Sequence, residues 1–158
     1  MKLSTTRRFN TSPERLWPLL FNSKMDNKQP CYFLCGLPKP VECQLKDSQG
    51  GVGMTRECIS DKGTITQTIL EWEPNRKLKF ELKETDIYFG PCIKSIVETF
   101  EIKSISKGQT TITRETEFKV IYLWKIFISL PMMIGLKAIH QYVFNNWTRL
   151  SQNESTLL

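Results

Sequence analysis

The sequence predicts a single α+β domain in which an antiparallel sheet of about seven strands is followed by a long C-terminal helix. Three observations support this fold class. The chain has 158 residues, which is the size of one domain. From residue 41 to about residue 122, apolar and polar side chains alternate with a period of two. Beyond Pro131, apolar side chains recur at the spacing of a helix.

The N-terminal segment predicts one strand and a short helix. Residues 3–9 are rich in Thr and can form an extended strand. Ser12 can cap a helix, and Pro13 fits a first turn that needs no amide donor. Because Pro18 cannot continue a regular helix, this helix should end near Asn22. The Pro and Gly residues that follow predict an irregular connection with room for one more helical turn.

The alternating region divides into strands wherever turn-forming residues interrupt it. Asp, Asn, Gly, Pro and Ser residues cluster at residues 47–51, 61–63, 73–75 and 107–108. The strands expected between these turns cover residues 41–45, 54–59, 64–72, 78–82, 96–102 and 112–120. Short turns favour antiparallel neighbours, because a parallel return would need a crossover of about a dozen residues or more.

The C-terminal part predicts a long amphipathic helix. The apolar run 121–136 contains Lys125 and Pro131, and a helix that crosses a bilayer would need about 20 mainly apolar residues. From Pro131 onward one helical face carries apolar side chains, namely Leu136, Ile139, Val143, Trp147 and Leu150. We therefore expect one domain over residues 1–150. Residues 151–158 are polar and should form a frayed tail.

Composition and charge exclude several classes of protein. With 40% hydrophobic and 24% charged residues, the chain is neither disordered throughout nor collagen-like. The formal net charge of +6 is spread along the chain without a basic block, so no nucleic-acid partner is expected. The first eight residues lack the apolar run of a secretory signal, which predicts a cytoplasmic protein.

The cysteines and the lone histidine predict neither a disulfide framework nor a metal site. Five scattered cysteines favour reduced, mostly buried thiols: Cys31, Cys35, Cys43, Cys58 and Cys92. Cys31 and Cys35 could begin a metal site, but no second pair follows at ligand spacing and His140 is the only histidine. No metal and no cofactor are therefore expected.

Strand alternation predicts which charged side chains share a face with apolar ones. Glu98 falls between Ile96 and Phe100, Arg114 alternates with Ile112 and Phe118, and Arg56 lies between Met54 and Cys58. Unpaired buried charge is costly, so Glu98 should pair with one of the arginines if these faces point inward. The hypothesis is that Arg56 and Arg114 anchor the carboxylate or head group of an apolar ligand. A shift in strand register would instead place one or more of these charges in solvent.

Two further groups of residues could take part in function. His140 could act as a general acid or base, together with Glu98 or Tyr88, or it could simply pack in the interior. Aromatic residues in two loops could form a gate, or they could belong to the core; these gate candidates are Tyr32, Phe33, Tyr88, Phe89, Gly90 and Pro91. An apolar mouth could touch a membrane transiently, with Lys125 and Lys137 near anionic headgroups, although core packing of this run is the alternative.

Several short motifs occur in an order that resembles the START-like SRPBCC superfamily. Residues 11–17 (TSPERLW) resemble its A/S-P-x-x-V/L-W opening, and residues 51–54 (GVGM) resemble its G-x-G strand entry. Residues 71–78 (EWEPNRKL) resemble its E-x-x-P-x-x-x-L hairpin. Gly90-Pro91 and residues 110–115 (TTITRE) resemble a section of the polyketide-cyclase/dehydrase-like members. The similarity covers about residues 3–150, nearly the whole chain.

This resemblance implies a helix-grip fold, in which a curved antiparallel sheet wraps around the C-terminal helix and leaves a cavity for an apolar small molecule or lipid. Binding or transport of such a molecule is the expected function, by a monomer or a homodimer. Two alternatives remain: a polyketide-type aromatase/cyclase or dehydratase, and an accessory protein-interaction module. Histidines found in the enzyme subgroup are absent from the matching stretch, so no catalytic role is carried over. Expected ligand contacts are Arg56, Glu98, Phe100, Arg114, Phe118, Leu136, His140 and Val143.

Overall fold

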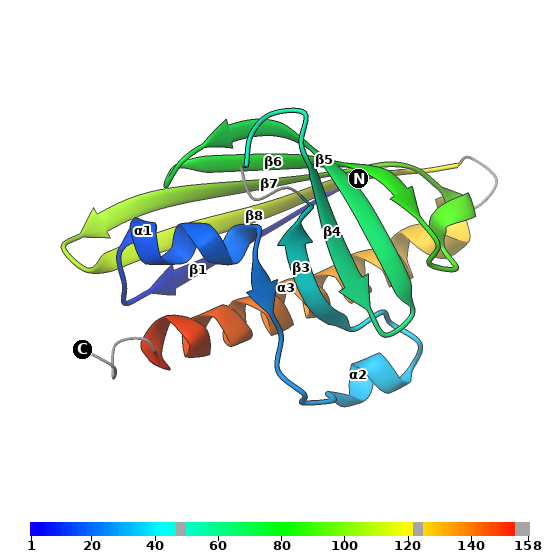
Figure 1. Cartoon of the computed structure of the whole chain (residues 1–158). Coiled ribbons are helices and arrows are strands. Elements are labelled where there is room, and N and C mark those ends of the chain that lie inside the picture. Colours follow the sequence, from blue (N-terminus) through cyan, green and yellow to red (C-terminus); the bar gives the residue numbers. More distant parts are fainter. Residues whose placement is uncertain (47–49, 122–124, 154–158) are drawn as a thin grey trace.

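One antiparallel sheet and one long helix form the body of the molecule (Figure 1). The computed structural model describes residues 1–46, 50–121 and 125–153. The strands among these residues are β1 (Lys2–Phe9), β2 (Ser23–Lys24), β3 (Pro40–Leu45), β4 (Thr55–Ser60), β5 (Gly63–Glu73), β6 (Lys77–Thr85), β7 (Ile93–Ser106) and β8 (Gln109–Val120). They form an eight-stranded sheet in the order β1-β8-β7-β6-β5-β4-β3-β2, and each neighbouring pair is antiparallel.

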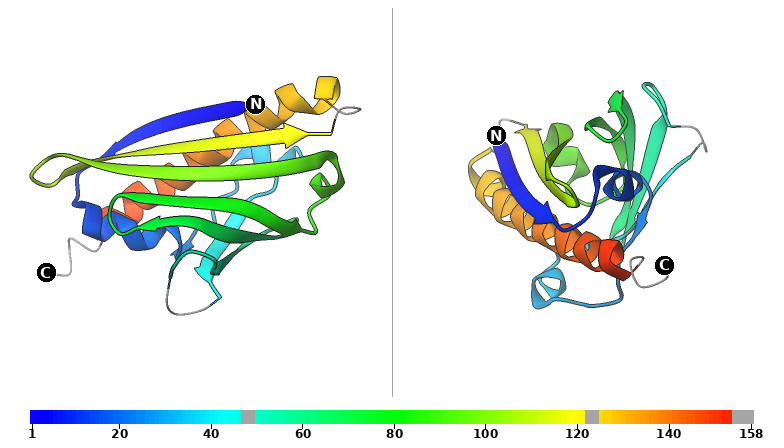
Figure 2. Two further views of the ribbon diagram at one scale, coloured as in Figure 1. Left: turned by 90° about the horizontal axis from the view of Figure 1, so that it is seen from above. Right: turned by 90° about the vertical axis from the view of Figure 1, so that its left-hand side faces the viewer.

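The sheet curls around helix α3 (Lys125–Asn153), which runs along its concave side (Figure 2). The first strand closes one edge of the sheet by pairing with the last, and the register places Thr5 opposite Arg114. Short helical segments occupy the connections: α1 (Pro13–Leu16), η1 (Trp17–Leu20), α2 (Cys31–Leu34) and η2 (Gly90–Cys92). The predicted α+β class, with an antiparallel sheet around a C-terminal helix, is confirmed.

Burial along the two longest strands follows the predicted alternation. Ile96, Glu98, Phe100 and Ile102 are buried in β7, while the intervening residues are partly exposed. In β8 the buried set includes Ile112, Arg114 and Phe118 on the same alternating positions. Since successive strand residues point to opposite faces, Glu98 and Arg114 lie on the face that α3 covers.

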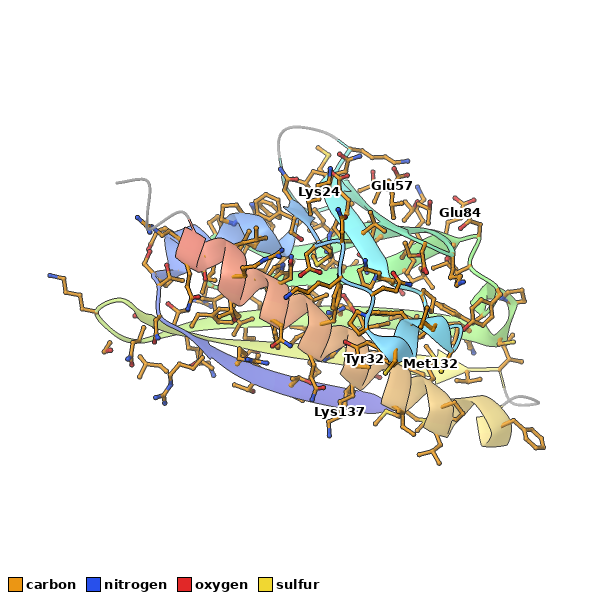
Figure 3. The ribbon with its side chains drawn as sticks, turned by 90° about the horizontal axis from the view of Figure 1, so that it is seen from below. Lys24, Tyr32, Glu57, Glu84, Met132 and Lys137 are labelled. Atoms are coloured by element: carbon orange, nitrogen blue, oxygen red, sulfur yellow. A yellow bond between two sulfur atoms is a disulfide. The ribbon has the colours of Figure 1, made fainter. Side chains whose placement is uncertain are left out.

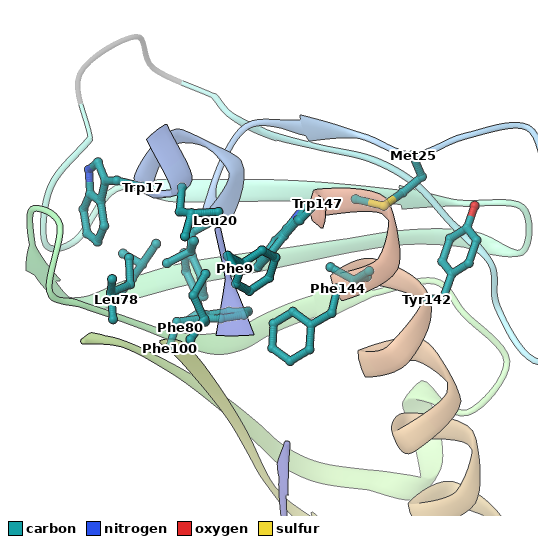
Figure 4. Packing of buried hydrophobic residues seen from close by; sticks show 14 of the residues in the cluster. Phe9, Trp17, Leu20, Met25, Leu78, Phe80, Phe100, Tyr142, Phe144 and Trp147 are labelled. Carbon is teal, nitrogen blue, oxygen red and sulfur yellow. The ribbon is translucent and has the colours of Figure 1, made fainter. Parts of the chain in front are cut away.

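An aromatic cluster fixes the C-terminal half of α3 to the sheet (Figure 4). Phe144 packs edge-on against Phe9 of β1, with ring centroids 5.9 Å apart. Trp147 lies 5.8 Å from Phe144 and also 5.8 Å from Phe100 of β7. Phe9, Phe100, Phe144 and Trp147 are each at most 1% exposed. Burial of such large rings is the main source of stability for this contact.

The N-terminal helix and the strand count differ from the prediction. The α-helical part spans only Pro13–Leu16, and a 3-10 turn continues to Leu20 rather than to Asn22. Ser12 occupies the N-cap position, but its side chain makes no capping hydrogen bond. The eighth strand, β2, contains only Ser23 and Lys24, so it is too short for a period-two pattern to reveal.

Helix α3 is longer than predicted at both ends. It begins at Lys125 and includes Pro131 as an internal residue, where the proline lacks the amide donor that would otherwise bond to the carbonyl of residue 127. At the other end it continues through Asn153, so residues 151–153 are helical rather than frayed. Three predicted features lie outside the described residues: the tail at 154–158, the turn at 47–49 and the end of the alternating region at 122. The domain boundary at 150 stays a prediction.

The expectation of reduced, buried cysteines is wrong at four positions. Cys43 of β3 and Cys58 of β4 face each other directly across two antiparallel strands and form a disulfide. Residues directly opposite each other on antiparallel strands are close enough for their thiols to form a bond. The separation of Cys43 and Cys58 in the sequence does not reveal this pairing. Cys31 and Cys35 are exposed free thiols beside the single turn of α2, and Cys92 is a partly buried free thiol.

We expect Phe144→Ala to lower the free energy of unfolding by about 3–5 kcal/mol, because it removes a fully buried ring between α3 and β1. The matched control is Phe127→Ala on the same helix, where the ring is exposed and the change should stay within about 0.5 kcal/mol. Urea unfolding followed by tryptophan fluorescence measures both variants. Equal effects of the two substitutions would contradict this packing.

Candidate functional site

A cavity of about 400 Å³ lies between the inner face of the sheet and the N-terminal part of α3. Most of its wall is apolar. The sheet side and its loops contribute Ile65, Leu82, Ile87, Ile96 and Phe100, and α3 contributes Phe127, Met132, Leu136, Ile139, Val143 and Trp147. The Cys43–Cys58 disulfide forms part of the same wall. A volume of this size, with an apolar lining and a few polar groups, is typical of small-molecule sites.

Three charged side chains reach this wall from three strands. Arg56 comes from β4, Glu98 from β7 and Arg114 from β8, and each is at most 7% exposed. The strand register places Phe80 opposite Glu98 and Phe100 opposite Arg114, so an aromatic ring neighbours each of these two charges on the inner face of the sheet. The structure therefore brings together the three charges that strand alternation had assigned to one face.

Glu98 and Arg114 form a buried ion pair. Arg114 donates a hydrogen bond from Nη2 to Glu98 Oε1 at 2.5 Å, and the Thr116 hydroxyl donates to the same oxygen at 3.3 Å. Burial alone would raise the pKa of Glu98, but the charge and hydrogen bond of Arg114 hold that pKa below its ordinary value. Glu98 is therefore ionised at neutral pH, and its charge is matched by Arg114.

Arg56 has no acidic partner of this kind among the residues that the structure describes. Its Nη1 donates to the amide oxygen of Gln67 at 3.2 Å, and its guanidinium lies 4.4 Å from the centre of the Phe80 ring. Its Nε is buried and has no hydrogen-bond partner within residues 1–46, 50–121 and 125–153. Burial lowers the pKa of Arg56 to about 10, with Arg114 adding to the effect and Glu98 opposing it. Arg56 thus remains a cation at neutral pH.

His140 lies behind the cavity wall and is fully buried. Its Nε2 is 2.9 Å from the Thr116 hydroxyl, and its Nδ1 is 3.0 Å from the Thr5 hydroxyl. Since Thr116 donates its hydroxyl proton to Glu98, the consistent neutral form has Nε2 donating to Thr116 and Nδ1 accepting from Thr5. Burial, followed by the charge of Arg114, lowers the pKa of His140 to about 3.

The predicted gate residues separate into three groups. Tyr88 and Phe89 line the mouth of the cavity, and the Tyr88 hydroxyl donates to the carbonyl oxygen of Gly36 at 3.2 Å, across from α2. Phe33 is instead a core residue, 1% exposed and packed edge-on against Tyr142. Tyr32, Gly90 and Pro91 are not part of the lining.

Leu37 and Pro38, in the loop after α2, complete the side of the mouth opposite Tyr88. A Cβ atom on Gly135 would lie only 2.7 Å from Leu37 Cδ1, so the glycine allows this loop to pack closely on α3. Seen from below in Figure 3, α2 with Tyr32 lies next to α3, and Lys137 points outward. The mouth is therefore formed by this loop, the Tyr88–Phe89 segment and the start of α3.

Six of the eight expected ligand contacts lie on the cavity wall: Arg56, Glu98, Phe100, Arg114, Leu136 and Val143. The other two, Phe118 and His140, are fully buried beside it. Gln67, the hydrogen-bond partner of Arg56, is not among the residues predicted from the sequence. The same alternation rule could have found it, because Gln67 lies between Ile65 and Ile69 on β5.

The described residues contain neither a cluster of metal-binding side chains nor a helix that could cross a membrane. Across residues 1–46, 50–121 and 125–153, no group of three or more His, Cys, Asp or Glu side chains is arranged to hold a metal ion. Within the same part of the chain, no helix combines the length and the apolar character needed to cross a bilayer.

Comparisons with known proteins identify the fold but no sequence family. No family model matches the chain, and no curated protein matches it. Solved structures match over nearly the whole chain. A protein from Mesorhizobium loti is 19% identical, with a TM-score of 0.66 over 97% of this chain and 98% of that one. A protein from Thermus thermophilus is 11% identical, with a TM-score of 0.69 over 98% and 99% of the two chains.

A third similar structure is an enzyme. Norcoclaurine synthase from Thalictrum flavum, in complex with dopamine and hydroxybenzaldehyde, is 13% identical, with a TM-score of 0.64 over 97% of this chain and 87% of that one. This chain has the helix-grip fold. At these identities the likeness extends to the fold alone, and the function has to be argued from the residues of the cavity.

His140 predicts how stability depends on pH. Its pKa is lowered from about 6.5 in the unfolded chain to about 3 in the folded one. Between these two values only the unfolded chain binds the proton. The free energy of unfolding therefore falls by about 1.4 kcal/mol for each pH unit below about pH 6.5. Because His140 is the only histidine, urea unfolding at pH 7 and pH 5.5 isolates its effect.

The matched variant is His140→Gln, which keeps a neutral donor and acceptor between Thr5 and Thr116. We expect it to flatten the loss of stability between pH 7 and pH 5.5. The same slope in the variant and the parent protein would show that His140 does not titrate as described.

Proposed function

We propose that this protein is a member of the SRPBCC superfamily that binds a hydrophobic small molecule or lipid in the cavity between the sheet and α3. The observation that carries this proposal is the 400 Å³ cavity, whose wall is apolar apart from a small group of charged and amide side chains. Apolar surface gives affinity in such a site, while a few fixed polar groups orient the ligand.

The arrangement of the candidate catalytic groups favours binding over catalysis. An aromatase/cyclase or dehydratase would need a pair of groups that exchange protons with a substrate in the cavity. His140 lies behind the wall with both ring nitrogens bonded to Thr hydroxyls, and Glu98 is paired with Arg114. Tyr88 is at the mouth, where its hydroxyl is bonded to Gly36. His140 and Glu98 share the Thr116 hydroxyl, but His140 is not part of the cavity lining and Tyr88 is 67% exposed at the mouth.

The cavity also distinguishes a ligand carrier from an accessory interaction module. A module that holds a partner protein would present an open groove with little enclosed volume. Here strands of the sheet, α3 and the mouth residues Tyr88 and Leu37 all contribute to the lining of one cavity of about 400 Å³. A small apolar ligand fits this shape better than a protein segment does.

Filling the cavity should abolish binding without unfolding the protein. Ile139 lines the cavity from α3, and we expect Ile139→Trp to weaken binding of a fluorescent fatty acid at least tenfold, because the larger ring occupies the ligand's space. The matched control is Gln141→Trp, which places the same ring on the exposed side of the helix. Unchanged binding by Ile139→Trp, with circular dichroism confirming the fold, would exclude the cavity as the site.

An apolar surface at the mouth supports a second part of the proposal, namely that ligand is exchanged at an anionic lipid surface. Phe127, Leu130 and Ile134 are 75%, 68% and 65% exposed and share one stripe of α3; we call them the α3 rim. Phe127 also lines the cavity, so the rim is continuous with the entrance. Lys137 follows one turn later on the exposed surface, where it can meet anionic headgroups; the Lys125 side chain lies outside those described.

We expect Leu130→Glu to lower binding to phosphatidylglycerol-containing vesicles about tenfold in a co-sedimentation assay, because it introduces a negative charge into the rim. Ile105→Glu, at an exposed site in the β7–β8 hairpin, is the matched control and should bind like the parent protein. If both variants sediment with vesicles as the parent does, the rim does not contact lipid. That result would leave ligand binding in the cavity unaffected.

A further inference from the structure

The charges on the cavity wall do not cancel. Among the described residues, the charged side chains that line the cavity are Arg56, Arg114 and Glu98. Arg114 and Glu98 neutralise each other through their 2.5 Å ion pair. His140, packed behind them, is neutral at physiological pH. One positive charge, that of Arg56, is therefore left over in a wall that is mostly apolar.

Arg56 is also short of hydrogen-bond acceptors. A guanidinium has five N–H donors, and the structure gives Arg56 one acceptor, the neutral amide oxygen of Gln67. The residue is only 4% exposed, and its buried Nε has no hydrogen-bond partner in the described part of the chain. A buried cation without a counter-ion is costly, whereas the Phe80 ring and the Gln67 amide compensate only part of that cost.

Among the described residues, Arg56 and Arg114 each have a buried Nε without a hydrogen-bond partner, and the two differ in that Arg114 forms an ion pair with Glu98. Arg114 donates a hydrogen bond to Glu98, and Glu98 also accepts one from Thr116. The charge of Arg114 is therefore neutralised within the protein. Arg56 is held in place by Gln67 and Phe80 but keeps its charge available to the cavity. The planar fork of a guanidinium matches the two oxygens of a carboxylate, and such charge-assisted pairs are stronger than neutral hydrogen bonds.

We infer that the ligand of this cavity carries a single carboxylate on an apolar body, and that Arg56 binds the carboxylate while Gln67 fixes the orientation of the guanidinium. The inference rests on the proposed function and names the ligand class for that site. One negative charge balances the surplus of one positive charge on the wall. The apolar body of the ligand then occupies the space lined by Ile96, Ile139 and Val143.

A set of ligands that differ only in the head group tests this inference. Decanoic acid, 1-decanol and decyl phosphate share one alkyl chain, and isothermal titration calorimetry at pH 7 measures their affinity for the full chain. We expect decanoate to bind at least about tenfold more tightly than 1-decanol, because a charged partner strengthens the hydrogen bonds of Arg56. Equal affinities for the acid and the alcohol, or tighter binding of decyl phosphate, would overturn the carboxylate assignment.

The variant Arg56→Met locates the head-group contact. It should bring the affinity for decanoate down to that for 1-decanol and leave 1-decanol binding unchanged, which also reports that the variant is folded. Arg76→Met, at an exposed position on the β5–β6 turn, is the matched control and should keep the preference of the parent protein. If Arg56→Met retains the preference for the acid, Arg56 is not the anchor.

Gln67→Leu gives a second test of the carboxylate contact, and the binding of all three ligands shows whether that contact or ligand binding itself is at fault. Gln67→Leu removes the acceptor that holds Arg56 and should reduce the preference for decanoate without removing it. Binding of 1-decanol and decanoate with equal affinity overturns only the carboxylate inference, since the cavity would still hold an apolar ligand. Failure of the parent protein to bind any of the three ligands overturns both.

Discussion

The packing of α3 along the concave side of the sheet is the contact on which the rest of the structure depends. Its C-terminal half is fixed by Phe144 and Trp147 against Phe9 and Phe100. Its N-terminal half faces the same sheet but does not fill the space in front of it, and the cavity lies there. One helix thus closes the core at one end and forms the wall of a ligand site at the other.

This division explains how a small domain can hold a cavity and remain stable. Atoms that line a cavity have fewer packing contacts, so the cavity end of α3 contributes less to stability. The large rings buried at the other end of the helix compensate for this loss. The polar residues around the cavity are held by strands rather than by loops: Arg56 on β4, Gln67 on β5, Glu98 on β7 and Arg114 on β8. A side chain on a flexible loop could turn outward and place its charge in water. Because Arg56 is attached to a rigid strand, its charge stays at the cavity wall.

Much of this arrangement could be predicted from the sequence, because it depends on strict alternation. The burial of Glu98 and Arg114 follows from the apolar residues on either side of them, and the long amphipathic run predicts α3. The position of His140 behind the wall could not be predicted in this way. Its helical face was clear, but its contacts with Thr5 and Thr116 depend on the pairing of β1 with β8, which lie far apart in sequence. The Cys43–Cys58 contact and the role of Phe33 in the core depend in the same way on tertiary neighbours.

The most direct test of the central claim is to locate an apolar ligand by NMR. Isotope-filtered nuclear Overhauser spectra of the protein with ¹³C-labelled octanoate report which methyl groups lie within a few ångströms of the alkyl chain. The cavity model predicts contacts from the ligand to the methyl groups of Ile96, Ile139 and Val143. Contacts confined to the exposed methyl groups of Leu130 and Ile134 would place the ligand on the surface and contradict it.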